Sequence, residues 1–250
     1  MPMGRYFMHL AYNGANFHGW QIQPHDVSVQ QTIEDALAML LRCSTPIVGA
    51  GRTDAGVSAR HMTAHFDMSD QSKFAQDTKL LVDKLNAIVG RDIAIYNIER
   101  VADHAHARFD AKWRTYRYYA LTYKSPFFNG LAWKASRNLD FDAMNRAAEL
   151  LLHTSDFTSF AKLHSDSRTN ICNVTHARWH KSEHEGVYYF EITADRFLRN
   201  MVRAVVGTLV EVGRGRLSVE GFAQVIRDAN RCSAGTSMPA HALYLWNVQY

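Results

Sequence analysis

The chain has 250 residues, of which 47% are hydrophobic and 21% are charged. This balance is typical of a folded globular protein and excludes an intrinsically disordered or low-complexity chain. Lysine and arginine outnumber aspartate and glutamate by 28 to 24, and the resulting net charge of +4 is compatible with an anionic partner without requiring one.

The three cysteines are odd in number and widely spaced, so the sequence predicts neither a zinc ribbon nor a disulfide framework. Free thiols are typical of the reducing cytoplasm, where we expect the protein to reside. The first residues lead directly into a predicted strand without an apolar leader segment. The apolar stretch at residues 204–212 is too short to span a bilayer, so we expect no association with a membrane.

In the first part of the chain, alternating side chains predict strands at residues 6–12 and 62–68, and residues 92–100 also indicate a strand. Ser28 and Gln31 have the spacing of a capping box, and the apolar positions that follow recur with the period of a helix. A second helix is expected near residues 77–87.

The second part shows a similar order. A strand is predicted at residues 113–123, Asp140 caps a helix, and three more strands are expected at residues 175–181, 188–194 and 243–250. A strongly apolar helix is predicted from Phe197 to Val212.

Related turn sequences suggest a duplication. The segments at residues 17–20 and 128–133 each follow a tyrosine-rich strand and precede a helix, at an offset on the order of 110 residues. We therefore predict an α+β protein with two similar halves. Residues 1–103 form the N-terminal half and residues 104–250 form the C-terminal half.

The segment at residues 49–59 carries one acid, Asp54, on a loop with three glycines. Glycine permits positive φ angles and a close approach of the backbone to a ligand, and a lone acid in such a loop is a candidate nucleophile. The spacing matches neither a Walker A loop nor a dinucleotide-binding fingerprint. The alternative is an ordinary surface turn capped by Asp54.

Basic and aromatic residues alternate after residue 104. His106, Arg108, Lys112 and Arg114 stand among Phe109, Trp113, Tyr116 and Tyr118. Such a mixture suits looped or single-stranded RNA, whose bases stack on aromatic rings while cations neutralise its phosphates. The alternative is an amphipathic strand with a solvated charged face.

Arg203 lies at the border of the apolar surface of the helix predicted from Phe197. Val206 and Val210 share its side of the helix, so a half-buried guanidinium is one interpretation. A buried guanidinium requires a carboxylate, and Asp54 is a possible partner. The alternative is that Arg203 extends to water.

Two other features indicate no site. His61 and His65 are four residues apart, which is a metal-binding spacing on a helix, but the alternation around them predicts a strand. Cys172 has no evident histidine and aspartate partners and is interpreted as a packing residue.

Taken together, five segments resemble the RNA pseudouridine synthases, in the order of that family and over nearly the whole chain. They are Gly51-Arg52-Thr53-Asp54-Ala55-Gly56-Val57-Ser58-Ala59, His106-Ala107-Arg108-Phe109, Arg114-Thr115-Tyr116-Arg117-Tyr118, Phe197-Leu198-Arg199-Asn200-Met201-Val202-Arg203 and Leu243-Tyr244-Leu245. The resemblance has one departure, because Ser58 stands where the family more usually has histidine.

This resemblance implies a pseudouridine synthase fold: a mostly antiparallel central sheet flanked by helices, with two similar halves forming a basic RNA-binding cleft. It also implies a homodimer that works without a metal, nucleotide or organic cofactor. The implied partner is tRNA, and the implied reaction is the isomerisation of uridine to pseudouridine on the 3′ side of the anticodon stem-loop.

The resemblance further implies roles for individual residues. Asp54 is the nucleophile, attacking either C6 of the base or C1′ of the ribose, and Arg203 is its ion-pair partner. Tyr116 stacks on the uracil and assists proton transfer. Arg52 and Leu243 also contact the substrate nucleotide, and the RNA backbone is held by His106, Arg108, Phe109, Lys112 and Arg114.

Two functions from other classes remain open at this point. A non-catalytic RNA-binding module would use the same basic and aromatic residues without needing Asp54. An aspartate-dependent nucleosidase would release free uracil instead of retaining the isomer.

Overall fold

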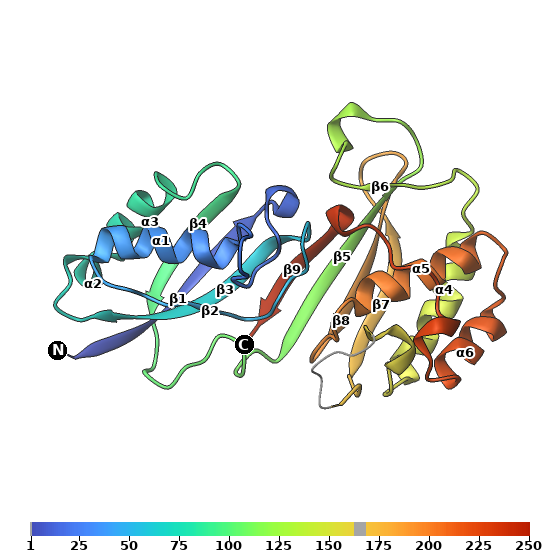
Figure 1. Ribbon diagram of the computed structural model, residues 1–250. Coiled ribbons are helices and arrows are strands. Elements are labelled where there is room, and N and C mark those ends of the chain that lie inside the picture. Colours follow the sequence, from blue (N-terminus) through green and yellow to red (C-terminus); the bar gives the residue numbers. More distant parts are fainter. Residues whose placement is uncertain (1, 163–168) are drawn as a thin grey trace. The chain divides into compact units, whose positions relative to one another are not determined.

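The computed structural model describes residues 2–162 and 169–250 (Figure 1). By its contacts the chain forms two compact units, Met1–Lys112 with Leu245–Tyr250, and Trp113–Tyr244. The predicted boundary between residues 103 and 104 therefore falls inside the first unit. The predicted α+β class is confirmed, because each unit combines a mostly antiparallel sheet with α-helices.

The sheet of the first unit is built around one long antiparallel pair. β1 (Met3–Tyr12) pairs with β3 (Ser58–Ser69) on one side and with β4 (Ile93–Arg100) on the other. The short β2 (Val48–Gly49) pairs with β3, and β9 (Leu243–Gln249) also lies beside β3. Met8 of β1 lies opposite Ala64 of β3, and both side chains are fully buried.

Three helices belong to this unit, α1 (Val29–Leu41), α2 (Lys73–Gln76) and α3 (Thr78–Asn86). The predicted cap of α1 is confirmed, since the Ser28 side chain accepts a hydrogen bond from the Gln31 backbone N–H. The Gln31 side chain donates to Asp35 instead of reaching back to Ser28, so the capping box is half formed. Ile33 and Leu37 of α1 are fully buried and supply the core beneath the sheet.

Within its described residues, the second unit combines four strands with three α-helices. Its strands are β5 (Trp113–Leu121), β6 (Trp133–Lys134), β7 (Val174–Lys181) and β8 (Val187–Ala194). Its α-helices are α4 (Phe141–Glu149), α5 (Met201–Gly213) and α6 (Val219–Arg227). Tyr118 and Phe190 are opposite one another on β5 and β8 and are fully buried, which marks the face that the helices cover.

Short 3₁₀ helices complete the described elements. They are Gly14–Asn16, Pro126–Phe128, Leu150–His153, Thr158–Phe160, Arg231–Ser233 and Ala240–Ala242.

The two units repeat one succession of elements. β1, α1, β2, β3 and α3 in the first unit correspond in order to β5, α4, β7, β8 and α5 in the second. The pairings also correspond, because β3 lies between β1 and β2 in the same way that β8 lies between β5 and β7. The two units therefore share this order of elements and this pattern of strand pairing.

One predicted helix begins later than expected. The helix predicted from Phe197 is α5, which begins only at Met201. Asn200 precedes it in the left-handed conformation, with φ of 67°, and this breaks the helical path before the first turn. Residues 197–200 of the predicted helix therefore lie outside α5, while Arg203 lies within it.

No pattern in the sequence had indicated α2, α6 or β6. In the described part of the chain, no helix combines the length and apolar character needed to cross a bilayer.

Candidate active site

Asp54 lies in the loop between β2 and β3 and is half-buried. The loop is anchored on both sides of Asp54. The Thr53 hydroxyl bonds with the buried Tyr12 hydroxyl at 2.8 Å, and the Thr53 carbonyl accepts from the Trp20 N–H. On the other side, the Val57 N–H donates to the Asp54 carbonyl at 3.1 Å. These bonds fix the backbone at Asp54 to the core of the first unit.

Close packing explains why several positions around this loop are occupied by glycine. Gly56 has φ of 78°, and Gly19 has φ of 92° with its Cα so near the loop that a Cβ would lie 2.5 Å from the Thr53 carbonyl oxygen. A Cβ on Gly14 would collide with the Val57 carbonyl. Gly51 differs, because its φ is not positive and a Cβ there would meet no atom of the described residues within 4 Å.

Ser58 and Arg52 have contrasting environments. Ser58 is 4% exposed, and its hydroxyl accepts a hydrogen bond from the Gly14 N–H at 3.0 Å. This bond ties the start of β3 to the turn after β1, which gives Ser58 a structural role. Arg52, two residues before Asp54, is exposed to solvent.

A second feature of the first unit is the tight turn at residues 105–110. His106 organises it: its backbone N–H donates to the Asp110 carboxylate, and its Nδ1 accepts from the N–H groups of Arg108 and Phe109. Arg108 and Phe109 are exposed, and the Phe109 side chain is 74% exposed. The turn therefore presents a guanidinium and an aromatic ring together to solvent. Lys112 beyond it is also exposed.

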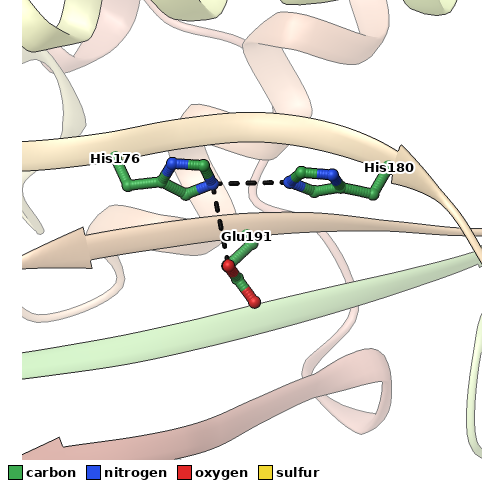
Figure 2. A group of neighbouring side chains, drawn as sticks. All are labelled: His176, His180 and Glu191. Carbon is green, nitrogen blue, oxygen red and sulfur yellow. Dashed lines mark hydrogen bonds and ion pairs between the residues drawn. The ribbon is translucent and has the colours of Figure 1, made fainter.

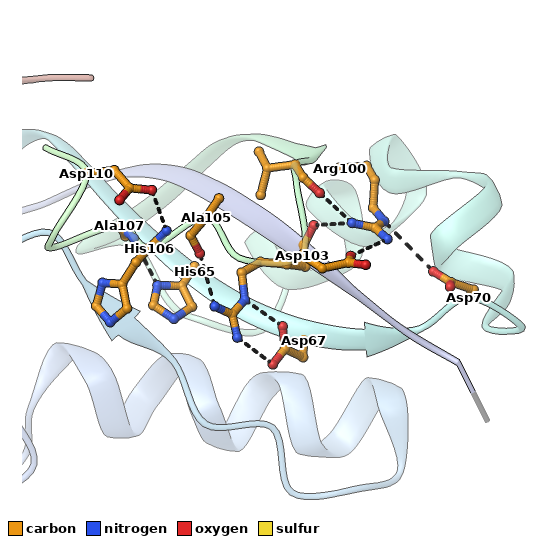
Figure 3. A network of polar contacts seen from close by, with 11 residues as sticks. His65, Asp67, Asp70, Arg100, Asp103, Ala105, His106, Ala107 and Asp110 are labelled. Carbon is orange, nitrogen blue, oxygen red and sulfur yellow. Dashed lines mark hydrogen bonds and ion pairs between the residues drawn. The ribbon is translucent and has the colours of Figure 1, made fainter.

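The interior of the unit holds this turn in place (Figure 3). The Ala107 N–H donates to Nδ1 of the buried His65, and the Tyr250 hydroxyl donates to the Ala107 carbonyl. Arg5 forms two bonds to Asp67 at 2.8 and 2.9 Å and donates a third to the Ala105 carbonyl. The bond from Arg5 lowers the pKa of the Asp67 carboxyl, so this ion pair stays charged.

His61 and His65 do not form a metal site with each other. Both lie on β3, as the alternation predicted, but His61 contacts His9 while His65 contacts the turn. Burial lowers the pKa of His65 to about 4. Among the described residues, the one group with metal-ligand geometry is elsewhere.

In the second unit, Tyr116 of β5 is half-buried and lies against Phe197. The two ring centroids are 5.0 Å apart and the planes meet at 81°, which is an edge-to-face contact. Phe197 therefore limits the orientation of the Tyr116 ring. Arg114, on the same strand, donates to the Asp195 carbonyl at 2.8 Å.

Arg203 lies in the first turn of α5, is half-buried and is fixed by two bonds with Met238. Its Nε donates to the Met238 carbonyl at 2.5 Å, while the Met238 N–H donates to the Arg203 carbonyl at 3.1 Å. Half-burial was one of the two interpretations of Arg203 in the sequence. Leu243, at the start of β9, is buried.

Two residues near Arg203 were given no role of their own in the site from the sequence. Tyr118 is fully buried, and its hydroxyl has no hydrogen-bond partner among the described residues. Burial raises the pKa of this hydroxyl, although the charge of Arg203 acts in the opposite direction. Met238 supplies the carbonyl that Arg203 binds. Only the burial of alternate positions on β5 could have indicated Tyr118, and no local pattern indicates Met238.

Comparison with known proteins decides the family. The chain matches the family model described as tRNA pseudouridine synthase over residues 147–250. It is 55% identical to tRNA pseudouridine synthase A of Parabacteroides distasonis over 99% of this chain and 96% of that protein. The chain belongs to the tRNA pseudouridine synthase family.

Other members of the family match over nearly their whole length. The chain is 53% identical to tRNA pseudouridine synthase A of Bacteroides fragilis, with coverage of 100% and 98%. It is 37% identical to tRNA pseudouridine synthase A of Chlorobaculum tepidum, with coverage of 97% and 96%. As a pseudouridine synthase, the protein is an isomerase, and the resemblance seen in the five sequence segments is confirmed.

Proposed function

We propose that this protein isomerises uridine to pseudouridine in tRNA, on the 3′ side of the anticodon stem-loop, with Asp54 as the nucleophile. Full-length similarity to proteins named tRNA pseudouridine synthase A supports the reaction and the class of RNA. The observation that carries the assignment of the nucleophile is the half-buried Asp54, fixed by Thr53 and Val57 in an anchored loop.

The reaction rearranges bonds without changing composition. The N1–C1′ glycosidic bond breaks, C5 of the uracil joins C1′, the proton on C5 leaves and N1 gains a proton. Because nothing is oxidised or hydrolysed overall, an ionised carboxylate that adds to C6 or to C1′ and later departs is sufficient as the covalent participant. The uridine must leave its stack to reach Asp54.

The remaining groups of the proposed site act on the base and on the charge of Asp54. Tyr116 stacks on the extruded uracil, and its hydroxyl assists the proton transfer from C5. Arg203 is the proposed ion-pair partner of Asp54, because a guanidinium favours the ionised carboxylate. Leu243 supplies an apolar contact to the base, and Arg52 contacts the adjacent phosphate.

Binding of the RNA backbone is assigned to the exposed turn and its surroundings. Arg108 and Lys112 neutralise phosphates, and Phe109 offers a ring to an unpaired base. His106 contributes by holding the turn in shape, as its bonds to Arg108 and Phe109 indicate. Arg114 extends the basic surface. We further propose that the enzyme works as a homodimer in the cytoplasm and needs no cofactor.

The test is incubation of the purified protein with tRNA that carries tritium at C5 of its uridines. Release of tritium to water with retention of the modified base is the expected result, and mapping the modified positions tests the anticodon stem-loop assignment. Free uracil would overturn the proposal in favour of a nucleosidase. RNA binding without tritium release would overturn it in favour of a non-catalytic module.

A further inference from the structure

One face of the second unit gathers three potential metal ligands that the proposed function does not use. They are His176 and His180 of β7 and Glu191 of β8 (Figure 2). Within residues 2–162 and 169–250, this is the one group of three histidine, cysteine or acidic side chains whose donor atoms all lie within 4.8 Å of one another.

The strand pairing itself brings these residues together. Side chains four residues apart on a strand point to the same face, so His176 and His180 share a face of β7. Glu191 is the cross-strand partner of Arg178, which lies midway between the two histidines. Directly opposite residues of an antiparallel pair also share a face. The group is therefore a property of the register of the β7–β8 hairpin.

The distances suit one small cation. Nε2 of His176 and Nε2 of His180 are 3.4 Å apart, and Nε2 of His176 is 3.7 Å from Oε1 of Glu191. Two nitrogens bound at about 2.0–2.1 Å to one tetrahedral zinc ion are separated by roughly 3.3–3.4 Å. The imidazole planes are inclined by only 16°, and Figure 2 shows the two Nε2 atoms facing each other.

Neighbouring groups fix the orientation of two of these side chains. Arg117 of β5 donates through Nε to Oε2 of Glu191 at 2.5 Å, so Oε1 is left directed at His176. The His180 ring stacks on Tyr189, with centroids 5.1 Å apart. Such outer contacts are what orient the ligands in metal sites.

We propose that His176, His180 and Glu191 bind a divalent transition-metal ion of the zinc type, which joins β7 to β8. Two imidazoles and one carboxylate form a common ligand set for zinc, and water can complete the tetrahedron. The ion takes no part in the isomerisation. It stabilises the hairpin by binding the folded chain in preference to the unfolded chain.

Two guanidinium groups near the three ligands affect the affinity for a dication. Arg117 neutralises part of the Glu191 charge, and the exposed Arg178 places a second guanidinium between the histidines on the same face. Both oppose a dication, so the site is weaker than an isolated set of the same ligands. Removing the charge of Arg178 must therefore strengthen binding, while removing a ligand must weaken it.

The experiment titrates the full-length protein, freed of metal with a chelator, with Co²⁺ and then with Zn²⁺. The expected result is the visible absorption of tetrahedral Co²⁺ at one equivalent per chain, displaced by Zn²⁺, with a higher melting temperature when Zn²⁺ is bound. His180→Gln and His176→Gln each lower the affinity by at least about 100-fold. Arg178→Gln raises it several-fold.

His153→Gln is the matched control, because His153 is exposed in the same unit and lies outside the group. Circular dichroism shows whether each variant is folded. The proposal is overturned if the unaltered protein gives no saturable tetrahedral spectrum. It is equally overturned if His153→Gln loses as much affinity as His180→Gln, or if Arg178→Gln weakens binding.

Discussion

Nδ1 of His65 accepts a hydrogen bond from the Ala107 backbone N–H at 3.1 Å. This bond joins the interior of β3 to the turn that presents Arg108 and Phe109 to solvent. A histidine can accept through Nδ1 only if that nitrogen carries no proton. Because burial lowers the pKa of His65 to about 4, the bond persists throughout the neutral range.

The stability of the protein should depend on pH through His65. Between about pH 6.5 and pH 4 the unfolded chain takes up a proton that the folded chain does not, so the free energy of unfolding falls as the pH falls. The expected loss by pH 4 is about 1–3 kcal/mol. In His65→Gln, whose amide oxygen can accept the same bond, denaturant unfolding should show a shallower pH dependence, whereas His153→Gln should keep the original one. Equal slopes in the unaltered protein and His65→Gln would contradict this account.

Replacement of the proposed nucleophile should abolish turnover while preserving RNA binding. Asp54→Asn retains the shape of the side chain but removes its charge, so tritium release should fall by at least about 1,000-fold. The affinity for tRNA, measured by filter binding, should change little. Asp142→Asn, an exposed position in the first turn of α4, serves as the control and should keep full activity. Turnover by Asp54→Asn at the unaltered rate would refute the assignment.

The ring and the hydroxyl of Tyr116 can be separated. Tyr116→Phe keeps the edge-to-face contact with Phe197 and the surface that stacks on uracil, whereas Tyr116→Ala removes both. We therefore expect Tyr116→Ala to bind tRNA more weakly than Tyr116→Phe, and Tyr116→Phe to lose turnover mainly in kcat. If both variants lose binding equally, stacking by this ring is not the source of affinity.

Arg203 should matter for stability as well as for activity. Arg203→Ala leaves the Met238 carbonyl without its side-chain donor, which costs about 1–3 kcal/mol of unfolding free energy for a buried acceptor. Activity should fall further than this loss explains, because the proposed partner of Asp54 is gone. Arg203→Lys keeps a positive charge without the guanidinium Nε and should recover part of the activity. Arg227→Ala, at the exposed end of α6, is the control and should change neither stability nor activity. An Arg203→Ala variant with unchanged melting temperature and turnover would contradict both roles.

Alanine substitutions at two glycines near Asp54 should differ in their effect on stability. Gly14→Ala introduces a Cβ that collides with the Val57 carbonyl, so the loop must shift, with a loss of about 1–3 kcal/mol in stability and a clear loss of turnover. The Cβ of Gly51→Ala meets no atom within 4 Å in the described part of the chain, so this variant should keep its melting temperature. Any loss of turnover in a stable Gly51→Ala variant would then report on the approach of RNA to this position.

Local chemistry explains which parts of the fold were predictable. Ser28 and Asp140 act as helix caps where the sequence placed them, because capping depends on residues only three positions apart. The strands with strict alternation were also predictable, because alternation depends on neighbouring residues in the sequence. The start of α5 was missed because Asn200 adopts φ of 67°, a conformation that asparagine permits but does not require.

The candidate site was predictable only in part. Asp54 stood out because an acid among glycines is unusual, and Arg203 because its helix is otherwise apolar nearby. The bond between His65 and Ala107 joins residues 42 positions apart, and the bond between Arg203 and Met238 joins residues 35 positions apart. Neither follows from local spacing, since only the folded chain creates such contacts.

The last residues of the chain belong to the unit that begins it. The Tyr250 ring contacts Phe7 at the beginning of the chain, its hydroxyl holds Ala107, and the Gln249 carbonyl accepts from Lys112. During synthesis on the ribosome, the first unit therefore lacks these contacts until residues 245–250 emerge from the exit tunnel. The second unit consists of one continuous stretch that ends at Tyr244, so its residues are all synthesised before those of the first unit are complete.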